Sequence, residues 1–286
     1  MKTLYLSDLD GTLLKSDETL SAFTCRAIER LAEQGMLFSY ATARSYNTAK
    51  KVTAPLGAVE LPLIVYNGAF IRENKSGRIL LSNYFNGGAA AIITELLEND
   101  IYPIVYSYID GAERFSYLYE KCTQGARDFV KSRAGDSRDN PVPSEEQLYL
   151  GEVFYLTCID SAEKLYPVYQ KFRSEYRCLY QRDFYTGGQW LEIMPPGATK
   201  ANAALRLKEL LGCDKLIAFG DSENDADLFA AADECYAVAN AVPALKAAAT
   251  GVIGSNDDDG VAKWLLKQFC ADQKADGKFY SSNCPS

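Results

Sequence analysis

The stretch LYLSDLDGTLL, residues Leu4–Leu14, begins as an apolar strand and ends in a Gly-Thr turn. Two aspartates, Asp8 and Asp10, lie where the strand ends. Because residues i and i+2 of a strand point to the same face, their Cα atoms are expected about 6.6 Å apart. Two charges at that separation repel by about 3 kcal/mol at an effective dielectric of about 20. Either water at an exposed turn or a bound cation must relieve this repulsion.

Composition restricts the partners of the chain. It has 286 residues, of which 48% are hydrophobic and 24% charged, a normal globular balance. Its net charge of −8 argues against nucleic-acid and membrane partners, because both select for basic patches. The expected partner is a small molecule, and the expected oligomeric state is a monomer or homodimer. An anionic substrate would need a few local cations or a metal to neutralise its charge.

The cysteines indicate where in the cell the protein is located, and the absence of histidine restricts the catalytic mechanisms that it can use. The eight cysteines form no CxxC pair, and most lie in apolar runs, which indicates reduced thiols and a cytoplasmic location. The first apolar run is broken at Ser7 and Asp8, so it does not resemble a signal peptide. The chain contains no histidine, which excludes a Ser-His-Asp triad, a Cys-His pair and a histidine base.

Strands alternate with helices in the first and last thirds of the chain, while the tyrosine-rich middle mixes both. This order predicts an α/β fold with a Rossmann-like doubly wound parallel sheet core and an inserted α+β cap domain. The predicted segments are residues 1–83 and 188–272 for the two parts of the core, 84–187 for the cap, and 273–286 for a polar tail.

At four places polar residues follow a strand or open a helix: LYLSDLDGT, MLFSYATAR, EIMPPGATK and KLIAFGDSENDADLF. The carboxyl ends of parallel strands form the ligand crevice of open α/β sheets. We therefore expect Asp8, Asp10, Thr42 and Asp221 at one edge. A helix start would explain one or two of the acids after Asp221. The whole set better fits a hard-cation site with oxygen ligands, such as Mg²⁺.

The motifs DLDGTLL, ATAR, GATK and GDSENDADLF resemble, in order and spacing, those of the haloacid dehalogenase-like phosphohydrolases. The large insertion between the second and third motifs resembles the Cof-like branch, which acts on sugar and cofactor phosphates. Smaller matches are YNGA, AVANAV and DDDGVAKWL. The resemblance covers nearly the whole chain except the tail, and it implies a Mg²⁺-dependent phosphatase that uses an aspartyl-phosphate.

The resemblance also implies residue roles. Asp8 would be the nucleophile, and Asp10 would protonate the leaving oxygen and then activate water. The implied Mg²⁺ ligands are Asp8, the Asp10 carbonyl, Asp221 and Asp225. The implied substrate and phosphate contacts are Gly11, Thr42, Ala43, Arg44, Lys200 and Asn224, with Thr42 and Lys200 also counted as catalytic.

Three of these positions leave an alternative open. Lys200 opens a helix, which favours a role in neutralising charge over that of an ordinary surface lysine. Arg44 either reaches the substrate or lies on the surface. Ala43 replaces a glycine that is common in this branch, which matters if a positive φ is needed there.

The cap is expected to cover the crevice and to recognise the leaving group, or else its aromatic residues simply pack its own sheet. Candidate recognition residues lie where the cap returns to the core: Arg182, Asp183, Tyr185, Gln189 and Trp190. Glu192 is a candidate for orienting Lys200. A phosphatase acting on a sugar phosphate or a cofactor phosphate is the predicted function; a phosphomutase and a non-catalytic sugar-phosphate-binding protein are the alternatives.

Overall fold

The structure is a computed structural model that describes residues 1–57, 60–182 and 188–275. The chain divides into two compact units. The core unit comprises Met1–Ser82 and Thr199–Ser286, and the cap unit comprises Asn83–Ala198. Within the described ranges, no helix has both the length and the apolar character needed to cross a membrane.

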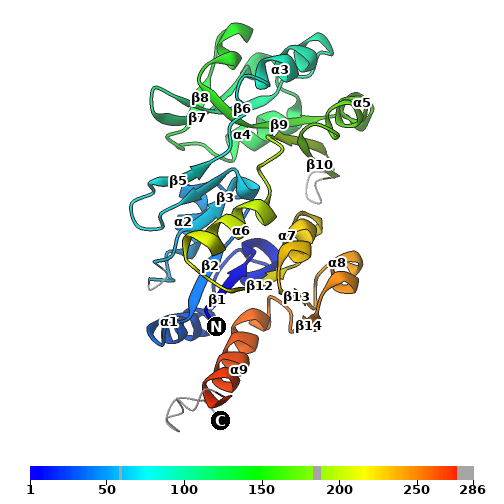
Figure 1. The fold of residues 1–286 in the computed structure, drawn as a ribbon. Coiled ribbons are helices and arrows are strands. Elements are labelled where there is room, and N and C mark those ends of the chain that lie inside the picture. Colours follow the sequence, from blue (N-terminus) through cyan, green and yellow to red (C-terminus); the bar gives the residue numbers. More distant parts are fainter. Residues whose placement is uncertain (58–59, 183–187, 276–286) are drawn as a thin grey trace. The chain divides into compact units, whose positions relative to one another are not determined.

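A parallel sheet of five strands forms the centre of the core unit, in the order β14-β13-β12-β1-β2 (Figure 1). Its strands are β1 (Thr3–Ser7), β2 (Leu37–Tyr40), β12 (Lys215–Gly220), β13 (Glu234–Val238) and β14 (Gly251–Ile253). β1 is an inner strand, and Leu4, Tyr5 and Leu6, whose side chains alternate between its two faces, are all buried. This burial on both faces explains why the strand is apolar throughout rather than alternating.

Helices follow the strands of the core unit, as the sequence predicts, and the α/β fold class is confirmed. They are α1 (Ala22–Glu33), α2 (Tyr46–Thr53), α6 (Lys200–Leu210), α7 (Ala226–Ala231), α8 (Pro243–Ala248) and α9 (Gly260–Ala275). Ser21, Ser45 and Thr199 cap α1, α2 and α6 by accepting a backbone N–H. α1 packs against α9, the helix nearest the C-terminus in Figure 1.

A three-stranded antiparallel sheet extends the core unit: β3 (Leu63–Val65), β4 (Phe70–Arg72) and β5 (Ile79–Ser82). A parallel bridge from Ala41 to Ile64 joins it to the end of β2. β4 and β5 form a hairpin, and Gly77 at its turn has a φ of 71°.

The cap unit is a mostly antiparallel sheet of six strands in the order β10-β11-β9-β6-β7-β8. The strands are β6 (Ile104–Ile109), β7 (Ala112–Tyr117), β8 (Asp139–Pro141), β9 (Glu152–Asp160), β10 (Arg177–Arg182) and β11 (Gln189–Met194). The helices are α3 (Ala89–Glu98), α4 (Gln124–Lys131) and α5 (Ala162–Phe172). A buried cluster that includes Ile92, Leu96, Leu156 and Leu165 packs α3 and α5 on the sheet.

The second boundary of the cap differs from the sequence-based one at residue 188. β11 pairs antiparallel with both β9 and β10, so it belongs to the cap sheet, and the core unit resumes at Thr199. Backbone pairing with strands inside the insertion decides this boundary. Of the predicted tail, residues 273–275 continue α9, and the remainder lies outside the described residues.

Candidate active site

Asp8 directly follows β1, and it remains tied to the sheet because its backbone N–H donates to the Phe219 carbonyl at 3.0 Å. Its side chain is only 5% exposed. The next residues, Leu9–Leu13, form a single tight turn in which Gly11 has a φ of 73°. The end of a buried strand thus holds a carboxylate that has almost no contact with solvent.

Asp225 is the buried acid of the loop that follows β12. Its Oδ2 accepts the backbone N–H groups of Asp221 at 3.0 Å and Ser222 at 3.2 Å. The residues Glu223–Asp225 form a short 3₁₀ turn, in which Ser222 and Asp225 make a capping box. Because these N–H groups occupy one carboxylate oxygen, Oδ1 is left for another partner.

Lys200, at the first position of α6, provides that partner. Its Nζ donates to Asp8 Oδ1 and to Asp225 Oδ1, both at 2.7 Å, and its side chain is 1% exposed. Burial lowers the pKa of Lys200, but the charges of Asp225 and Asp8 and the hydrogen bonds to them outweigh burial and hold the pKa above its usual range. Lys200 is therefore a buried cation between two acids, not a surface lysine.

Three carboxylates of this edge lie close enough together to share a metal ion. Oxygens of Asp8, Asp221 and Asp225 are all within 4.8 Å of one another. Burial raises the pKa of Asp8 well above its ordinary value, and burial with the charge of Asp225 raises the pKa of Asp221 to about 6. One lysine does not neutralise three acids, and an all-oxygen donor set of this kind fits a hard divalent cation.

Gly11 allows the turn after β1 to approach Asp221. A Cβ on Gly11 would lie 2.4 Å from Asp221 Oδ2, and the positive φ also favours glycine. Thr12 Oγ1 donates to Asp221 Oδ1 at 3.0 Å, and Asn240 Nδ2 donates to the Gly11 carbonyl at 2.7 Å. The turn is thereby fixed against the loops that follow β12 and β13.

Thr42 lies at the same sheet edge, just beyond β2, and it is fully buried. Its Oγ1 accepts the backbone N–H of Arg44 at 3.1 Å, and the hydroxyl proton has no acceptor in the part of the chain that the structure describes. Ala43 is exposed and does not have a positive φ, so alanine is compatible with the backbone here. Thr42 can therefore donate to a ligand, as the sequence suggests.

Arg44 pairs with protein acids. Its guanidinium donates to both carboxylate oxygens of Asp10, and also to Glu18. The hydrogen bonds to Asp10, opposed by burial, raise the pKa of Arg44 further above its usual range. Sequence reasoning did not find Glu18, because it lies in an ordinary polar loop.

Asn224 is oriented by a second asparagine. Its Oδ1 accepts the Ser222 hydroxyl at 2.7 Å, and its Nδ2 donates to Asn67 Oδ1 at 3.3 Å. Asn67 is buried and has a φ of 51° in the YNG turn after β3. The sequence YNGA was a smaller match in the family resemblance, but no role in the site was assigned to Asn67.

The candidate recognition residues that the structure describes lie in the cap sheet. Arg182 ends β10, and Gln189, Trp190 and Glu192 belong to β11; Asp183 and Tyr185 lie outside the described residues. Trp190 packs edge-on against Phe129 with ring centroids 5.1 Å apart.

Glu192 was a candidate for orienting Lys200, but its hydrogen-bond partner is another cap residue. It accepts a hydrogen bond from the Tyr155 side chain. Asp8 and Asp225 are the acids that hold Lys200. The sequence EIMPPGATK suggested proximity along the chain, whereas β11 pairing directs Glu192 into the cap sheet.

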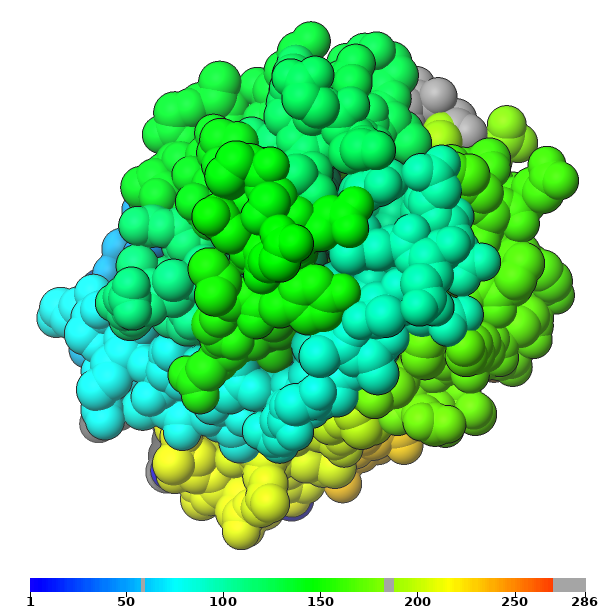
Figure 2. Space-filling view, turned by 90° about the horizontal axis from the view of Figure 1, so that it is seen from above, coloured from blue at the N-terminus to red at the C-terminus, as the bar shows by residue number. Residues whose placement is uncertain are grey.

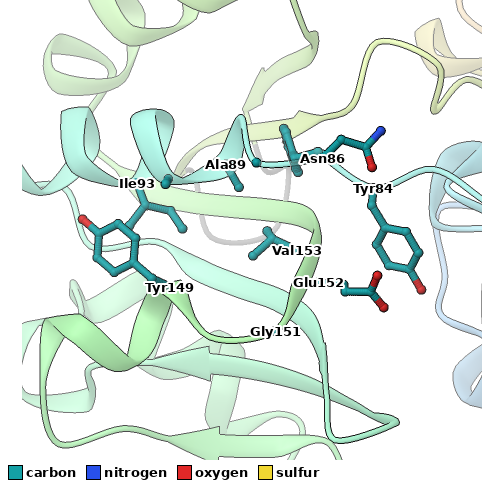
Figure 3. Close-up of a pocket in the computed structure, with 11 residues that line it drawn as sticks. Tyr84, Asn86, Ala89, Ile93, Tyr149, Gly151, Glu152 and Val153 are labelled. Atoms are coloured by element: carbon teal, nitrogen blue, oxygen red, sulfur yellow. The ribbon is translucent and has the colours of Figure 1, made fainter.

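A separate cavity of about 290 Å³ lies within the cap unit (Figure 3). Tyr149 lies at one end of it, and Tyr84 and Glu152 lie at the other. The segments around residues 84–93 and 149–153 that form it are adjacent on the surface seen in Figure 2. None of the acids that surround Lys200 lines this cavity.

The fold and this site place the chain in a known class. A family model described as haloacid dehalogenase-like hydrolase matches residues 5–265, and the chain belongs to that family. The solved structure of TM0651 from Thermotoga maritima is similar, with a TM-score of 0.74 and 25% identity, covering 93% of this chain and 97% of that one. The resemblance inferred from the four motifs is confirmed.

Similar proteins narrow the class to phosphatases. Two relatives from Bacillus subtilis (strain 168), YitU and YwtE, are both named 5-amino-6-(5-phospho-D-ribitylamino)uracil phosphatase. YitU is 26% identical over 92% of this chain and 96% of its own length. YwtE is 28% identical over 94% of this chain and 98% of its own length. The chain is accordingly a phosphoric monoester hydrolase.

Proposed function

We propose that this phosphatase hydrolyses a small phosphorylated metabolite through an aspartyl-phosphate on Asp8, with Mg²⁺ as its cofactor. One observation carries the proposal. Asp8 is a buried carboxylate 2.7 Å from the Lys200 ammonium, and Asp221 and Asp225 lie beside it. A carboxylate nucleophile that must approach a phosphate dianion needs such positive charge close by.

The donor set fits Mg²⁺, which is usually bound by one or two carboxylates, waters and a substrate phosphate. Asp8, Asp221 and Asp225 would hold the ion, with the Asp10 carbonyl as a further ligand. When bound, Mg²⁺ would offset the negative charge of the phosphoryl group.

In the first step, an Asp8 oxygen attacks phosphorus and the bond to the leaving oxygen breaks. Asp10 donates a proton to that oxygen. Lys200 stabilises the charge on the phosphoryl oxygens, and Thr42 and Asn224 donate hydrogen bonds to them. In the second step, water attacks the aspartyl-phosphate, Asp10 accepts a proton from that water, and Asp8 is released with inorganic phosphate.

The names of the Bacillus subtilis relatives guide the choice of substrate. Their named substrate carries its phosphate on a ribityl chain attached to a pyrimidine. We propose a substrate of the same general class, a phosphate ester on a sugar, polyol or cofactor. The enzyme is further proposed to act in the cytoplasm as a monomer or homodimer.

The test is p-nitrophenyl phosphate turnover by wild type, Asp8→Asn and Asp10→Asn, each with and without Mg²⁺. We expect Mg²⁺-dependent release of inorganic phosphate by wild type, and a loss of at least about 10³-fold in Asp8→Asn. Activity that survives Asp8→Asn would refute the nucleophile. A panel of phosphorylated sugars, polyols and cofactors, ranked by kcat/KM, would then identify the substrate class.

The same panel separates the two alternatives. A phosphomutase would convert one sugar phosphate into its isomer with little release of inorganic phosphate. A non-catalytic binding protein would bind sugar phosphates without turnover. Inorganic phosphate released in proportion to substrate consumed excludes both.

A further inference from the structure

Two nitrogens of the Arg44 guanidinium donate hydrogen bonds to the Asp10 carboxylate. Nε donates to Oδ1 at 3.1 Å and to Oδ2 at 2.9 Å, and Nη2 donates to Oδ1 at 2.5 Å. A planar guanidinium that engages both oxygens of a carboxylate fixes the rotation of that carboxylate as well as its position. A lysine at this position would supply charge without fixing the orientation.

The backbone of Arg44 is itself held in place. Its N–H donates to Thr42 Oγ1 at 3.1 Å, and its carbonyl accepts the Tyr66 N–H at 3.0 Å. Its side chain is 19% exposed, compared with 46% for Asp10. The better-buried and better-anchored partner is thus the arginine, so it is Arg44 that orients Asp10.

Glu18 holds the other side of the guanidinium, since its Oε2 accepts from Arg44 Nη2 at 2.8 Å. Glu18 has a φ of 61°, an uncommon conformation for a residue with a side chain. Two contacts of its loop with Asp257 support that conformation: Lys15 Nζ donates to the carbonyl of Asp257, and Ser16 donates to its carboxylate. The loop therefore presents Glu18 to Arg44 from a fixed position.

We propose that Arg44, held by its hydrogen bond to Glu18, is the positioning residue for Asp10. Its effect falls mainly on the second half of the reaction, the hydrolysis of the aspartyl-phosphate. This inference rests on the proposed function. With one edge of the carboxylate occupied by the guanidinium, the lone pairs that remain point away from Arg44. That orientation selects where the Asp10 carboxylate can accept a proton.

The two halves of the reaction depend on Asp10 differently when the substrate is p-nitrophenyl phosphate. In the first half, the bond from phosphorus to the aryl oxygen breaks and nitrophenolate leaves as a stable anion, so no proton donor is needed. In the second half, water attacks phosphorus, the bond to Asp8 breaks, and a water proton passes to Asp10. Misorientation of Asp10 should slow only this second half.

The experiment is rapid-quench kinetics of wild type, Arg44→Gln, Glu18→Gln and Arg206→Gln with p-nitrophenyl phosphate and Mg²⁺. Phosphoenzyme is measured by intact mass. Arg206 is an exposed arginine that pairs with the equally exposed Glu209 on α6, so Arg206→Gln is the matched control. Circular dichroism checks that each variant is folded.

We expect Arg44→Gln to form phosphoenzyme at nearly the wild-type rate and to hydrolyse it about 10²-fold more slowly. Nitrophenol release should then show a burst, phosphoenzyme should accumulate, and KM should not rise. Glu18→Gln should also slow hydrolysis of the phosphoenzyme relative to its formation, by a smaller factor. Arg206→Gln should match wild type. Glu18→Gln alone tests the inference if Arg44→Gln does not fold.

Two results would overturn the inference. A rise in KM without a burst would make Arg44 a substrate-binding residue, and equal slowing of both halves would make its role structural. The activity of Asp8→Asn distinguishes a failure of the inference about Arg44 from a failure of the proposed function. If Asp8→Asn still turns over, the proposed function fails; if Asp8→Asn is inactive and Arg44→Gln shows no burst, only the role of Arg44 fails.

Discussion

Lys200 Nζ lies 2.7 Å from Asp8 Oδ1, although the two residues are 192 positions apart in the chain. The same nitrogen lies 2.7 Å from Asp225 Oδ1. A buried charge network of this kind need not stabilise a protein more than apolar packing would, but it is costly to break. The three side chains therefore act as a unit. Substitution of Lys200 would leave two buried carboxylates without a compensating positive charge.

Lys200→Met should lower the free energy of unfolding by about 3–5 kcal/mol, because Asp8 and Asp225 would remain buried without their cation. Urea unfolding near neutral pH measures this. Lys208→Met is the control, since Lys208 pairs with the more exposed Asp233 at 2.9 Å, and its loss should cost about 1 kcal/mol or less. Equal costs for the two variants would contradict the buried network.

Gly11→Ala should abolish activity and destabilise the fold. The added Cβ would lie 2.4 Å from Asp221 Oδ2, at a φ of 73°. Gly212→Ala is the control, because Gly212 also has a positive φ, of 60°, but a Cβ there meets nothing within 4 Å. It should cost about 1 kcal/mol and leave activity unchanged. Normal activity of Gly11→Ala would show that the two loops need not approach so closely.

Mg²⁺ should raise the thermal unfolding temperature of wild type, because the ion binds the folded acidic cluster and not the unfolded chain. At a concentration about 100 times its dissociation constant, the gain is about 2.7 kcal/mol. Asp221→Asn should lose most of this shift. Asp128→Asn, which alters an exposed acid on α4, should keep it. An unchanged shift in Asp221→Asn would remove Asp221 from the ligand set.

Glu192→Gln should stabilise the protein above about pH 7 and have little effect near pH 4. Burial, opposed by the Tyr155 hydrogen bond, raises the pKa of Glu192 to about 7. The folded state thus binds this proton more tightly than the unfolded state does, so stability falls as pH rises from about 4.5 to 7. Glutamine does not ionise and avoids this loss of stability, which amounts to about 3 kcal/mol.

Urea unfolding of Glu192→Gln and wild type near pH 5 and pH 8 measures the difference. Glu152→Gln, at an exposed position of β9, is the control and should change the free energy of unfolding by less than about 0.5 kcal/mol. A stabilisation by Glu192→Gln that is the same at both pH values would contradict the raised pKa.

The core was predictable because its signals are local. One apolar run ends at Asp8 and another at Gly220 and Asp221. Each run predicts a strand and, directly after it, a polar residue at the edge of the sheet. The carboxyl ends of parallel strands meet at one edge, so the cluster of Asp8 with Asp221 followed from the order of strands and helices alone.

The remaining features depend on contacts that the sequence does not encode locally. β11 belongs to the cap sheet because β9 and β10 offer it backbone partners, and its residues alone do not identify those partners. Glu18 reaches Arg44 through a loop conformation with a positive φ, and Asn67 reaches Asn224 through another. Side-chain contacts between distant loops arise from the folded backbone, so composition and periodicity carried no sign of them.

β1 and β12 are neighbours in the sheet, although the whole cap unit, Asn83–Ala198, lies between them in the sequence. During synthesis, the first strand emerges from the ribosome long before the strand that will lie beside it. Asp8 cannot meet Lys200 or Asp225 until translation has passed both of them. The acidic centre is therefore assembled late, and the high sequence separation of its contacts is of the kind associated with slow folding.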